Sequence, residues 1–298
     1  MSDLRLGYIG LGIMGRPAAL NLLRAGFPVH LWARREERLQ SVVAEGGQGC
    51  VSPKAVAEQV DIVFTNVSDT ADVEEVILGR DGVLEGARPG SVVVDMSTIS
   101  PAATRRIAEK LEARGVHMLD APVSGGERGA IDGTLSIMVG GPAEVFERVL
   151  PLLEVMGENI VYMGDQGAGQ VTKACNQVVI AQTIAAVGEA FILAKASGVD
   201  PIRVRKALLG GFAGSRVLEA HGQRMLDGDY RPGFKAKLHK KDMRIVLETA
   251  EQLGIALPGA ALATQFLNAL VGAGGAELDS AAICAMQEKL NGVRLSES

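Results

Sequence analysis

Lys173, Asn176 and Gln177 could act together on a carbonyl group. The two amides follow the lysine by three and four residues, so a helix would place all three side chains on one face. An ammonium group can donate a proton to a carbonyl oxygen, and a neighbouring amide can orient it and bind the same substrate. A lone helical lysine is usually a solvated charge, and either amide could be the orienting one.

A glycine-rich segment could hold a dinucleotide. The residues Gly10-Leu11-Gly12-Ile13-Met14-Gly15 follow a predicted strand and open a predicted helix, which is the context that a GxGxxG fingerprint requires. The first glycine allows a tight turn, the second lets the backbone approach a pyrophosphate, and the third lets helix pack on strand. We expect these six residues to bind the cofactor, together with Val67 and Thr98.

The end of the second predicted strand indicates which dinucleotide is bound. An NAD-specific site carries Asp or Glu there, to accept hydrogen bonds from the ribose hydroxyls. Here the strand continues into Ala33, Arg34 and Arg35, and guanidinium groups match a 2′-phosphate. Glu36 and Glu37 follow, so the arginines could instead be solvated charges at a helix start. We expect NADP as cofactor, with Arg34 as a ligand of its phosphate and NAD as the alternative.

Two further segments could bind an anion. Ser124, Gly125 and Gly126 form a turn sequence whose hydroxyl and N–H groups could hold a carboxylate, although such sequences also make plain turns. Lys241 and Asp242 lie in a basic stretch that could equally be a solvated helix face. The four histidines show no metal-ligand spacing, and no Asp/Glu pair calls for a divalent ion. We therefore expect chemistry without a metal.

Taken in order, these segments resemble the four signatures of the β-hydroxyacid dehydrogenase family across nearly the whole chain. The matching residues are Gly10–Gly15, Asp120–Gly126 with its continuation to Gly141, Gly167–Gln177, and Lys240–Asp242. The resemblance implies that Lys173 and Asn176 are catalytic and that Lys241 also reaches the cofactor. It further implies that the substrate is bound by Ser124, Gly125, Gly126, Asn176, Gln177, Lys241 and Asp242. The family often has a second Asn where this chain has Gln177.

Within the family, three segments resemble the subgroup that interconverts tartronate semialdehyde and glycerate. They are Asp120–Glu127, Gly210–Ser215 and Arg231–Phe234. The resemblance implies an NADPH-dependent reductase of a small carboxylate semialdehyde. A reductase of the 3-hydroxyisobutyrate or succinic semialdehyde type is the alternative within the enzymes. A nucleotide-binding interaction module is the alternative outside them, and the retained Lys173 argues against it.

The elements that must position these residues divide into two parts. Strands are predicted at Leu6–Gly10, Val29–Trp32, Ile62–Asn66, Val92–Met96, His117–Asp120, Leu135–Val139 and Ile160–Met163. They alternate with amphipathic stretches, which predicts βαβ units and a parallel sheet. After Gly164–Gly169 only helical periods remain, beginning with a long helix from Val171 to about Ser197. We expect an α/β Rossmann-type domain (1–164), joined by that helix to an all-α domain (165–298).

Local signals predict the helix ends of the second part. Asp200-Pro201 is expected to start a helix, Gly254 to end one, and Asp279 to cap a last helix through Leu290. The segment Val178–Ala194 is interrupted by polar residues and is expected to fall short of a membrane span. Because Val178–Leu193 is apolar on most sides, we expect its own domain and also a partner subunit to bury it, in a homodimer or homotetramer.

Composition excludes several classes of protein. The 298 residues are 47% hydrophobic and 22% charged, which is typical of a globular chain with about two domains. A net charge of -5 offers no basic field for nucleic acid. The three cysteines are scattered, which suits a reducing compartment, and the N-terminal residues lack the features of a secretory signal. We expect a cytoplasmic protein.

Overall fold

The computed structural model describes residues 4–295, and the chain divides between Lys173 and Ala174 into two compact units. The expected boundary lay before the long helix, α9 (Ala168–Ala196). The contacts instead assign the first turns of α9 to the first unit. The start of this helix belongs to the first unit because Asp120 of that unit caps it.

The first unit is built on one nine-stranded sheet in the order β3-β2-β1-β4-β5-β6-β8-β7, with β9 paired to β8. Its strands are β1 (Leu6–Ile9), β2 (Val29–Trp32), β3 (Gln48–Gly49), β4 (Ile62–Thr65), β5 (Val92–Asp95), β6 (His117–Asp120), β7 (Val123–Ser124), β8 (Leu135–Gly140) and β9 (Gly157–Gly164). All seven predicted strands are present. The short strands β3 and β7 were not predicted, and β8 runs antiparallel to β6 and β7, so the expectation of a wholly parallel sheet was wrong there.

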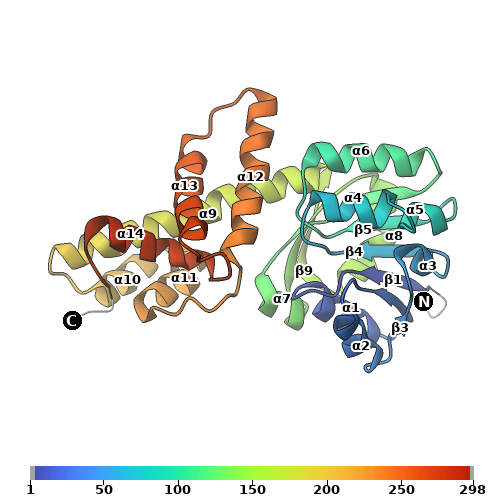
Figure 1. Cartoon of the computed structure of the whole chain (residues 1–298), viewed down its shortest axis with the longest axis horizontal. Helices are drawn as coiled ribbons and strands as arrows, with labels where there is room; N and C mark the ends of the chain where they lie inside the picture. Colours follow the sequence, from blue (N-terminus) through green and yellow to red (C-terminus); the bar gives the residue numbers. More distant parts are fainter. Residues whose placement is uncertain (1–3, 296–298) are drawn as a thin grey trace. The chain divides into compact units, whose positions relative to one another are not determined.

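Helices cover both faces of this sheet (Figure 1). One face packs against α1 (Gly15–Arg24), α2 (Glu36–Val43), α7 (Gly126–Asp132) and α8 (Ala143–Leu153). The other packs against α3 (Pro53–Ala57), α4 (Thr70–Leu78), α5 (Val83–Gly86) and α6 (Pro101–Glu112). Neighbouring strand residues alternate between the faces, as Tyr8 and Ile9 do, because successive side chains of a strand point in opposite directions.

The order of the strands reverses beside β1. The chain passes from β1 to β2 and β3 on one side and then returns to place β4 on the other side of β1. In open α/β sheets, ligands bind at such a reversal, outside the carboxyl ends of the strands. The glycine-rich segment leaves β1 at this point.

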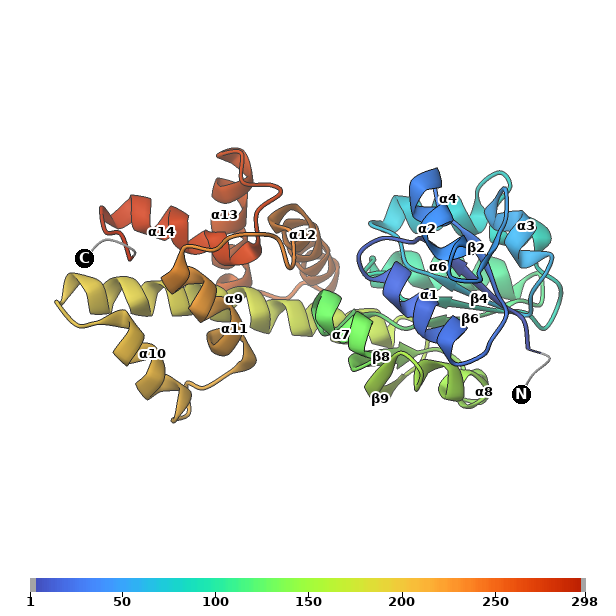
Figure 2. The same cartoon turned by 90° about the horizontal axis from the view of Figure 1, so that it is seen from below.

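The second unit is helical in its described residues, as expected (Figure 2). The remainder of α9 packs with α10 (Pro201–Leu209), α11 (Arg216–Asp227), α12 (Ala236–Leu253), α13 (Pro258–Gly272), the 3-10 turn η1 (Ser280–Ala282) and α14 (Ile283–Asn291). The predicted ends are confirmed. Asp200 caps α10, Gly254 ends α12 in a left-handed conformation, and Asp279 caps η1, which leads into α14.

Helix α9 is long and apolar enough, by length and composition alone, to cross a membrane. This corrects the expectation that its polar residues exclude a span. Half of its most apolar window is nevertheless buried inside the structure, and a core helix passes the same test. Residues such as Ile184 and Phe191 are fully buried in the core of the second unit.

Asp120, at the end of β6, ties the start of α9 to the sheet. Its buried carboxylate accepts hydrogen bonds from the backbone N–H groups of Gly167, at 2.7 Å, and Gln170, at 2.8 Å. The first N–H groups of a helix lack partners within the helix, so this carboxylate satisfies donors that would otherwise be buried unpaired. Burial raises the pKa of Asp120, although these hydrogen bonds act to lower it. A side chain at Gly169 would collide with Met138 and Asp120, so only glycine allows this close approach.

Replacing Asp120 with Ala should therefore destabilise the protein. Each buried donor left without a partner costs about 1–3 kcal/mol, so we expect the free energy of unfolding to fall by at least about 2 kcal/mol. Denaturant unfolding of the variant measures this loss. Asp165→Ala is the control, because Asp165 is an exposed carboxylate beside the same helix start. Equal stability of the two variants would contradict the role of Asp120 as a cap.

Candidate active site

Three glycines follow β1, and a side chain would meet different surroundings at each of them. Gly10 has a φ of 99°, and a side chain there would collide with the backbone of Asn66. A side chain at Gly15 would collide with the carbonyl of Gly10, so helix α1 packs directly on the turn. A side chain at Gly12 would meet nothing within 4 Å. The turn thus leaves open space at the N-terminal end of α1, which fits the pyrophosphate of a dinucleotide.

The residues between these glycines differ in exposure. The side chain of Leu11 is buried in the core and can offer a ligand only its backbone. Ile13 is partly exposed, and Met14 precedes the first turn of α1. Of the predicted cofactor residues in this segment, Gly12 and Ile13 therefore have the most accessible surroundings.

Hydrogen bonds join the carboxyl ends of β1, β2, β4 and β5. The N–H of Gly10 donates to the carbonyl of Trp32, and the N–H of Asn66 donates to that of Ile9. The N–H of Val67 donates to Ser97 Oγ at 2.9 Å. The structure thus places three predicted cofactor segments, the glycine turn, Val67 and Thr98, along one edge of the sheet.

Gln170 connects this edge to the helix that carries Lys173. Its side-chain oxygen accepts from the N–H of Ile99 at 3.1 Å, and its amide nitrogen donates to the carbonyl of Ser97 at 2.7 Å. Ser97 and Ile99 flank Thr98. Lys173 follows one turn later on α9 and is only 7% exposed. The first turns of α9 are therefore fixed to the segment that follows β5, and sequence reasoning did not identify Gln170 as the link.

Asp95 joins the ends of β4 and β5 at the same edge through buried hydrogen bonds. It is fully buried, and its carboxylate accepts from Thr65 Oγ1 at 2.8 Å and from the N–H of Ser97 at 3.2 Å. Burial raises its pKa from 3.8 to about 6, although these hydrogen bonds and that from the Ser97 hydroxyl oppose the shift. Asp120 lies beside Asp95 on the adjacent strand, and its charge adds to the rise.

The expected anion-binding turn lies between β7 and α7. Ser124 is half-buried at the end of β7, and Gly125 and Gly126 have φ values of 140° and 64°. Successive residues with such unusual backbone angles can point N–H groups into a concavity that binds anions. A replacement of Gly125 would strain the backbone, so Ser124→Ala is the cleaner substitution.

The two amides of α9 have different partners within the second unit. Gln177 is buried, and its amide nitrogen donates to Asp242 Oδ2 at 2.5 Å. Asn176, which is less buried, donates to Gln177 Oε1 at 2.8 Å. Lys241 Nζ lies 2.9 Å from Asp242 Oδ1. Gln177 and Asp242 therefore join α9 to α12, and Asn176 is the more accessible amide.

Arg34 is engaged by two carboxylates of α4. Its guanidinium lies 2.6 Å from Asp72 Oδ1 and 3.5 Å from Glu75 Oε2. The predicted phosphate ligand is thus held by acidic residues far along the chain. Glu36 and Glu37 occupy the first turn of α2, as the interpretation of a helix start predicted.

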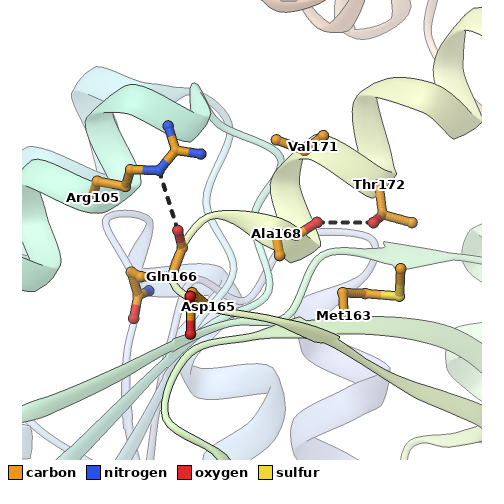
Figure 3. Close-up of a pocket in the computed structure, with 7 residues that line it drawn as sticks. All are labelled: Arg105, Met163, Asp165, Gln166, Ala168, Val171 and Thr172. Carbon is orange, nitrogen blue, oxygen red and sulfur yellow. Dashed lines mark hydrogen bonds between the residues drawn. The ribbon is translucent and has the colours of Figure 1, made fainter.

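A surface pocket lies beside the first turn of α9 (Figure 3). Its lining residues are Arg105, Met163, Asp165, Gln166, Ala168, Val171 and Thr172. None of the predicted site residues lines it, so we assign no part of the reaction to it. Among the residues that the structure describes, no group of three His, Cys, Asp or Glu could hold a metal ion.

Family models match both parts of the chain. Residues 5–164 match the NAD binding domain of 6-phosphogluconate dehydrogenase. Residues 167–286 match the model described as the NAD-binding part of NADP-dependent 3-hydroxyisobutyrate dehydrogenase. The 2-hydroxy-3-oxopropionate reductase of Escherichia coli (strain K12) is 46% identical over 280 residues, covering 94% of this chain and 96% of the relative.

Solved structures share the fold over nearly the whole chain. The 3-hydroxyisobutyrate dehydrogenase of Mycobacterium tuberculosis with L-serine has a TM-score of 0.89 and 30% identity, covering 95% of this chain and 99% of that one. Psf3 in complex with NADP+ and 2-OPP has a TM-score of 0.87 and 25% identity, with the same coverage of both chains. These proteins have the expected arrangement of a Rossmann-type domain and a helical domain.

The raised pKa of Asp95 predicts how stability depends on pH. Between about pH 4 and pH 6 the unfolded chain has lost this proton while the folded protein retains it, so the free energy of unfolding should fall as pH rises. Asp95→Asn cannot ionise and should remove a fall of roughly 2–3 kcal/mol across this window. Denaturant unfolding at several pH values measures it, with Asp165→Asn as control. Parallel pH profiles of parent and Asp95→Asn would contradict the prediction.

Proposed function

The chain belongs to the β-hydroxyacid dehydrogenase family, and we propose that it is an NADPH-dependent reductase that interconverts tartronate semialdehyde and glycerate. The family membership makes it an NAD(P)-dependent enzyme, so the alternative of a non-catalytic interaction module is set aside. The finer assignment is supported by the reductase from Escherichia coli, which covers almost the entire chain at 46% identity.

One observation in the structure carries this proposal. Gln170 fixes the beginning of α9 to the segment that follows β5, so the helix of Lys173 starts at the edge that holds the glycine turn. This contact supports the proposal, because a proton donor on this helix would belong to the same framework as the residues proposed to bind the dinucleotide. Correct relative placement of reacting groups is a large part of the rate enhancement of an enzyme.

The residues proposed to hold the dinucleotide are Gly10–Gly15, Val67 and Thr98, with Arg34 at its 2′-phosphate. When bound, the nicotinamide supplies the hydride for reduction. The chain itself contributes binding, orientation and a proton. Arg34 is suited to a phosphate because its fork of N–H donors matches phosphate oxygens.

Lys173 is proposed to donate the proton to the oxygen of the substrate carbonyl. It is largely buried, so a substrate held against it would be shielded from water. Asn176 is the amide proposed to orient the substrate, because it is less buried than Gln177. Gln177 and Asp242 are proposed to position Asn176 and Lys241 through their hydrogen bonds.

Two groups are proposed to bind the carboxylate of the substrate. The turn of Ser124, Gly125 and Gly126 offers a hydroxyl and backbone N–H groups, and Lys241 offers a positive charge. A carboxylate that accepts several such hydrogen bonds is bound more strongly than a neutral group of the same size. A carboxylate site of this kind would select an acid over a neutral aldehyde of the same size.

A dehydrogenase of the 3-hydroxyisobutyrate type is the second candidate, because the Mycobacterium tuberculosis structure and the model matched by residues 167–286 carry that name. A succinic semialdehyde type reductase would use the same residues on another carbon skeleton. We also propose a cytoplasmic homodimer or homotetramer. The exposed Val179 and Leu193 on α9 support association of subunits, since large exposed apolar side chains favour it.

A panel of aldehydes tests the substrate. We expect tartronate semialdehyde to have the highest kcat/KM with NADPH, above methylmalonate semialdehyde and succinic semialdehyde, as followed by absorbance of the reduced nicotinamide. Glyceraldehyde, which lacks the carboxylate, should be poorer by roughly 10-fold to 150-fold, since a hydrogen bond to a charged group contributes about 1.5–3 kcal/mol. A preference for methylmalonate semialdehyde would assign the second candidate instead, and equal use of glyceraldehyde would contradict a carboxylate site.

Lys173→Ala should lower kcat with the preferred substrate by about 100-fold to 10,000-fold, because a general acid typically contributes this much. Binding of NADPH, measured by its fluorescence, should change little. Lys173→Arg is the matched variant, because it keeps the positive charge but does not release its proton near neutral pH. High activity in Lys173→Arg would show that a charge, rather than a proton donor, is needed at this position.

A further inference from the structure

The carboxyl end of β2 and the first turn of α4 meet through their charged side chains. Arg34 Nη2 lies 2.6 Å from Asp72 Oδ1, and Glu75, one turn along α4, lies 3.5 Å from the same nitrogen. The Arg34 side chain is 66% exposed and that of Asp72 only 24%. The guanidinium therefore lies against a half-buried carboxylate while much of it stays open to solvent.

This ion pair stands beside the dinucleotide turn. Strands β2 and β4 flank β1 on its two sides, and the residues after them lead to Arg34 and to α4 respectively. The N–H of Gly10 donates to the carbonyl of Trp32, so the glycine turn and the end of β2 are held together. Arg34, which follows the end of β2, thus extends from a position beside the glycine turn to the first turn of α4.

We propose that Asp72 is a specificity-determining residue for the cofactor. Its carboxylate, assisted by that of Glu75, competes with the 2′-phosphate of NADPH for the Arg34 guanidinium and so limits the preference for NADPH over NADH. The inference rests on the proposed role of Arg34 as a phosphate ligand.

The charges at this position give the direction of the effect. Two carboxylates already oppose the single charge of Arg34, and a phosphate monoester adds about 1.5 to 2 further negative charges at neutral pH. The phosphate must displace Asp72 from the guanidinium or share it, and it is repelled by both carboxylates in either case. NADH carries no phosphate there, so it neither has to displace Asp72 from Arg34 nor brings a phosphate that the carboxylates repel.

The size of the effect follows from exposure. An exposed ion pair contributes about 0.2–1 kcal/mol, which corresponds to roughly 1.4-fold to 5-fold in a binding constant. Salt screens exposed charges, so the effect should be largest at low ionic strength. Because the pair is at the surface, replacing Asp72 should leave the fold intact.

Binding of adenine nucleotide fragments to the full-length protein tests the proposal without any substrate. Adenosine 2′,5′-bisphosphate and 5′-AMP are titrated by calorimetry, and NADPH and NADH by fluorescence, into the parent and Asp72→Asn. We expect Asp72→Asn to bind adenosine 2′,5′-bisphosphate and NADPH about 1.4-fold to 5-fold more tightly, with 5′-AMP and NADH unchanged. The gain should shrink at high salt and grow in Asp72→Asn/Glu75→Gln.

Two control variants isolate the pair. Glu74→Gln removes a carboxylate of the same helix that contacts Arg106 instead of Arg34, and it should change no binding constant. Arg34→Leu should abolish the preference for the 2′-phosphate and reduce the gain from Asp72→Asn to the part that comes from direct repulsion of the phosphate, as a double-mutant cycle shows.

The outcomes separate this inference from the proposed function. Equal or weaker binding of adenosine 2′,5′-bisphosphate by Asp72→Asn, while Arg34→Leu still removes the phosphate preference, overturns the competition and leaves Arg34 as the ligand. An Arg34→Leu variant that binds all four nucleotides like the parent overturns the role of Arg34, and the inference with it. Neither result bears on the substrate, which is measured separately.

Discussion

The carboxylate of Asp120 is the contact on which the placement of α9, the helix that carries Lys173, depends. It is buried at the end of β6 and accepts hydrogen bonds from the first N–H groups of α9. A negative charge at a helix N-terminus satisfies unpaired donors and interacts favourably with the helix dipole. Since glycine at position 169 brings the helix directly against the sheet, the orientation of the first turns of α9, and with them Lys173, is set by the sheet itself.

A continuous chain of hydrogen bonds, most of them buried, extends from this cap along the edge of the sheet. Asp95 accepts from Ser97, whose hydroxyl accepts from Val67 and whose carbonyl accepts from Gln170. This network has an energetic cost, because it buries two neighbouring carboxyl groups. The pKa values of Asp95 and Asp120 are both raised, mainly by burial. Hydrogen bonds between buried polar groups rigidify a site, although the second carboxylate oxygen of Asp95, Oδ2, is buried without a hydrogen-bond partner among the described residues. The same buried contacts thus cost energy and hold in place the segments predicted to bind the dinucleotide.

The charges proposed to select the cofactor differ from this buried network because they lie at the surface. Water and salt screen the ion pairs of Arg34 with Asp72 and Glu75, so the strength of these pairs can shift by small amounts without a change of fold. In this family member the rigid edge would determine that a dinucleotide binds, while the exposed charges would determine how strongly its 2′-phosphate is favoured. Mutations at the two places should therefore have separable consequences.

The sequence alone determined the strands, the long helix, the helix ends at Asp200, Gly254 and Asp279, and the family. Hydrophobic periods, glycines and capping residues act over a few positions, so they can be recognised without the fold. Strands β3 and β7 are two residues long and leave no period to detect, and the antiparallel course of β8 depends on how the chain returns in space. Only the tertiary structure decided which side chains meet, namely Asp120 with the start of α9, Gln177 with Asp242, and Arg34 with Asp72. Each of these pairs joins elements that are distant along the chain, and side-chain pairing over such separations is set by the packing of the elements and not by their local sequence.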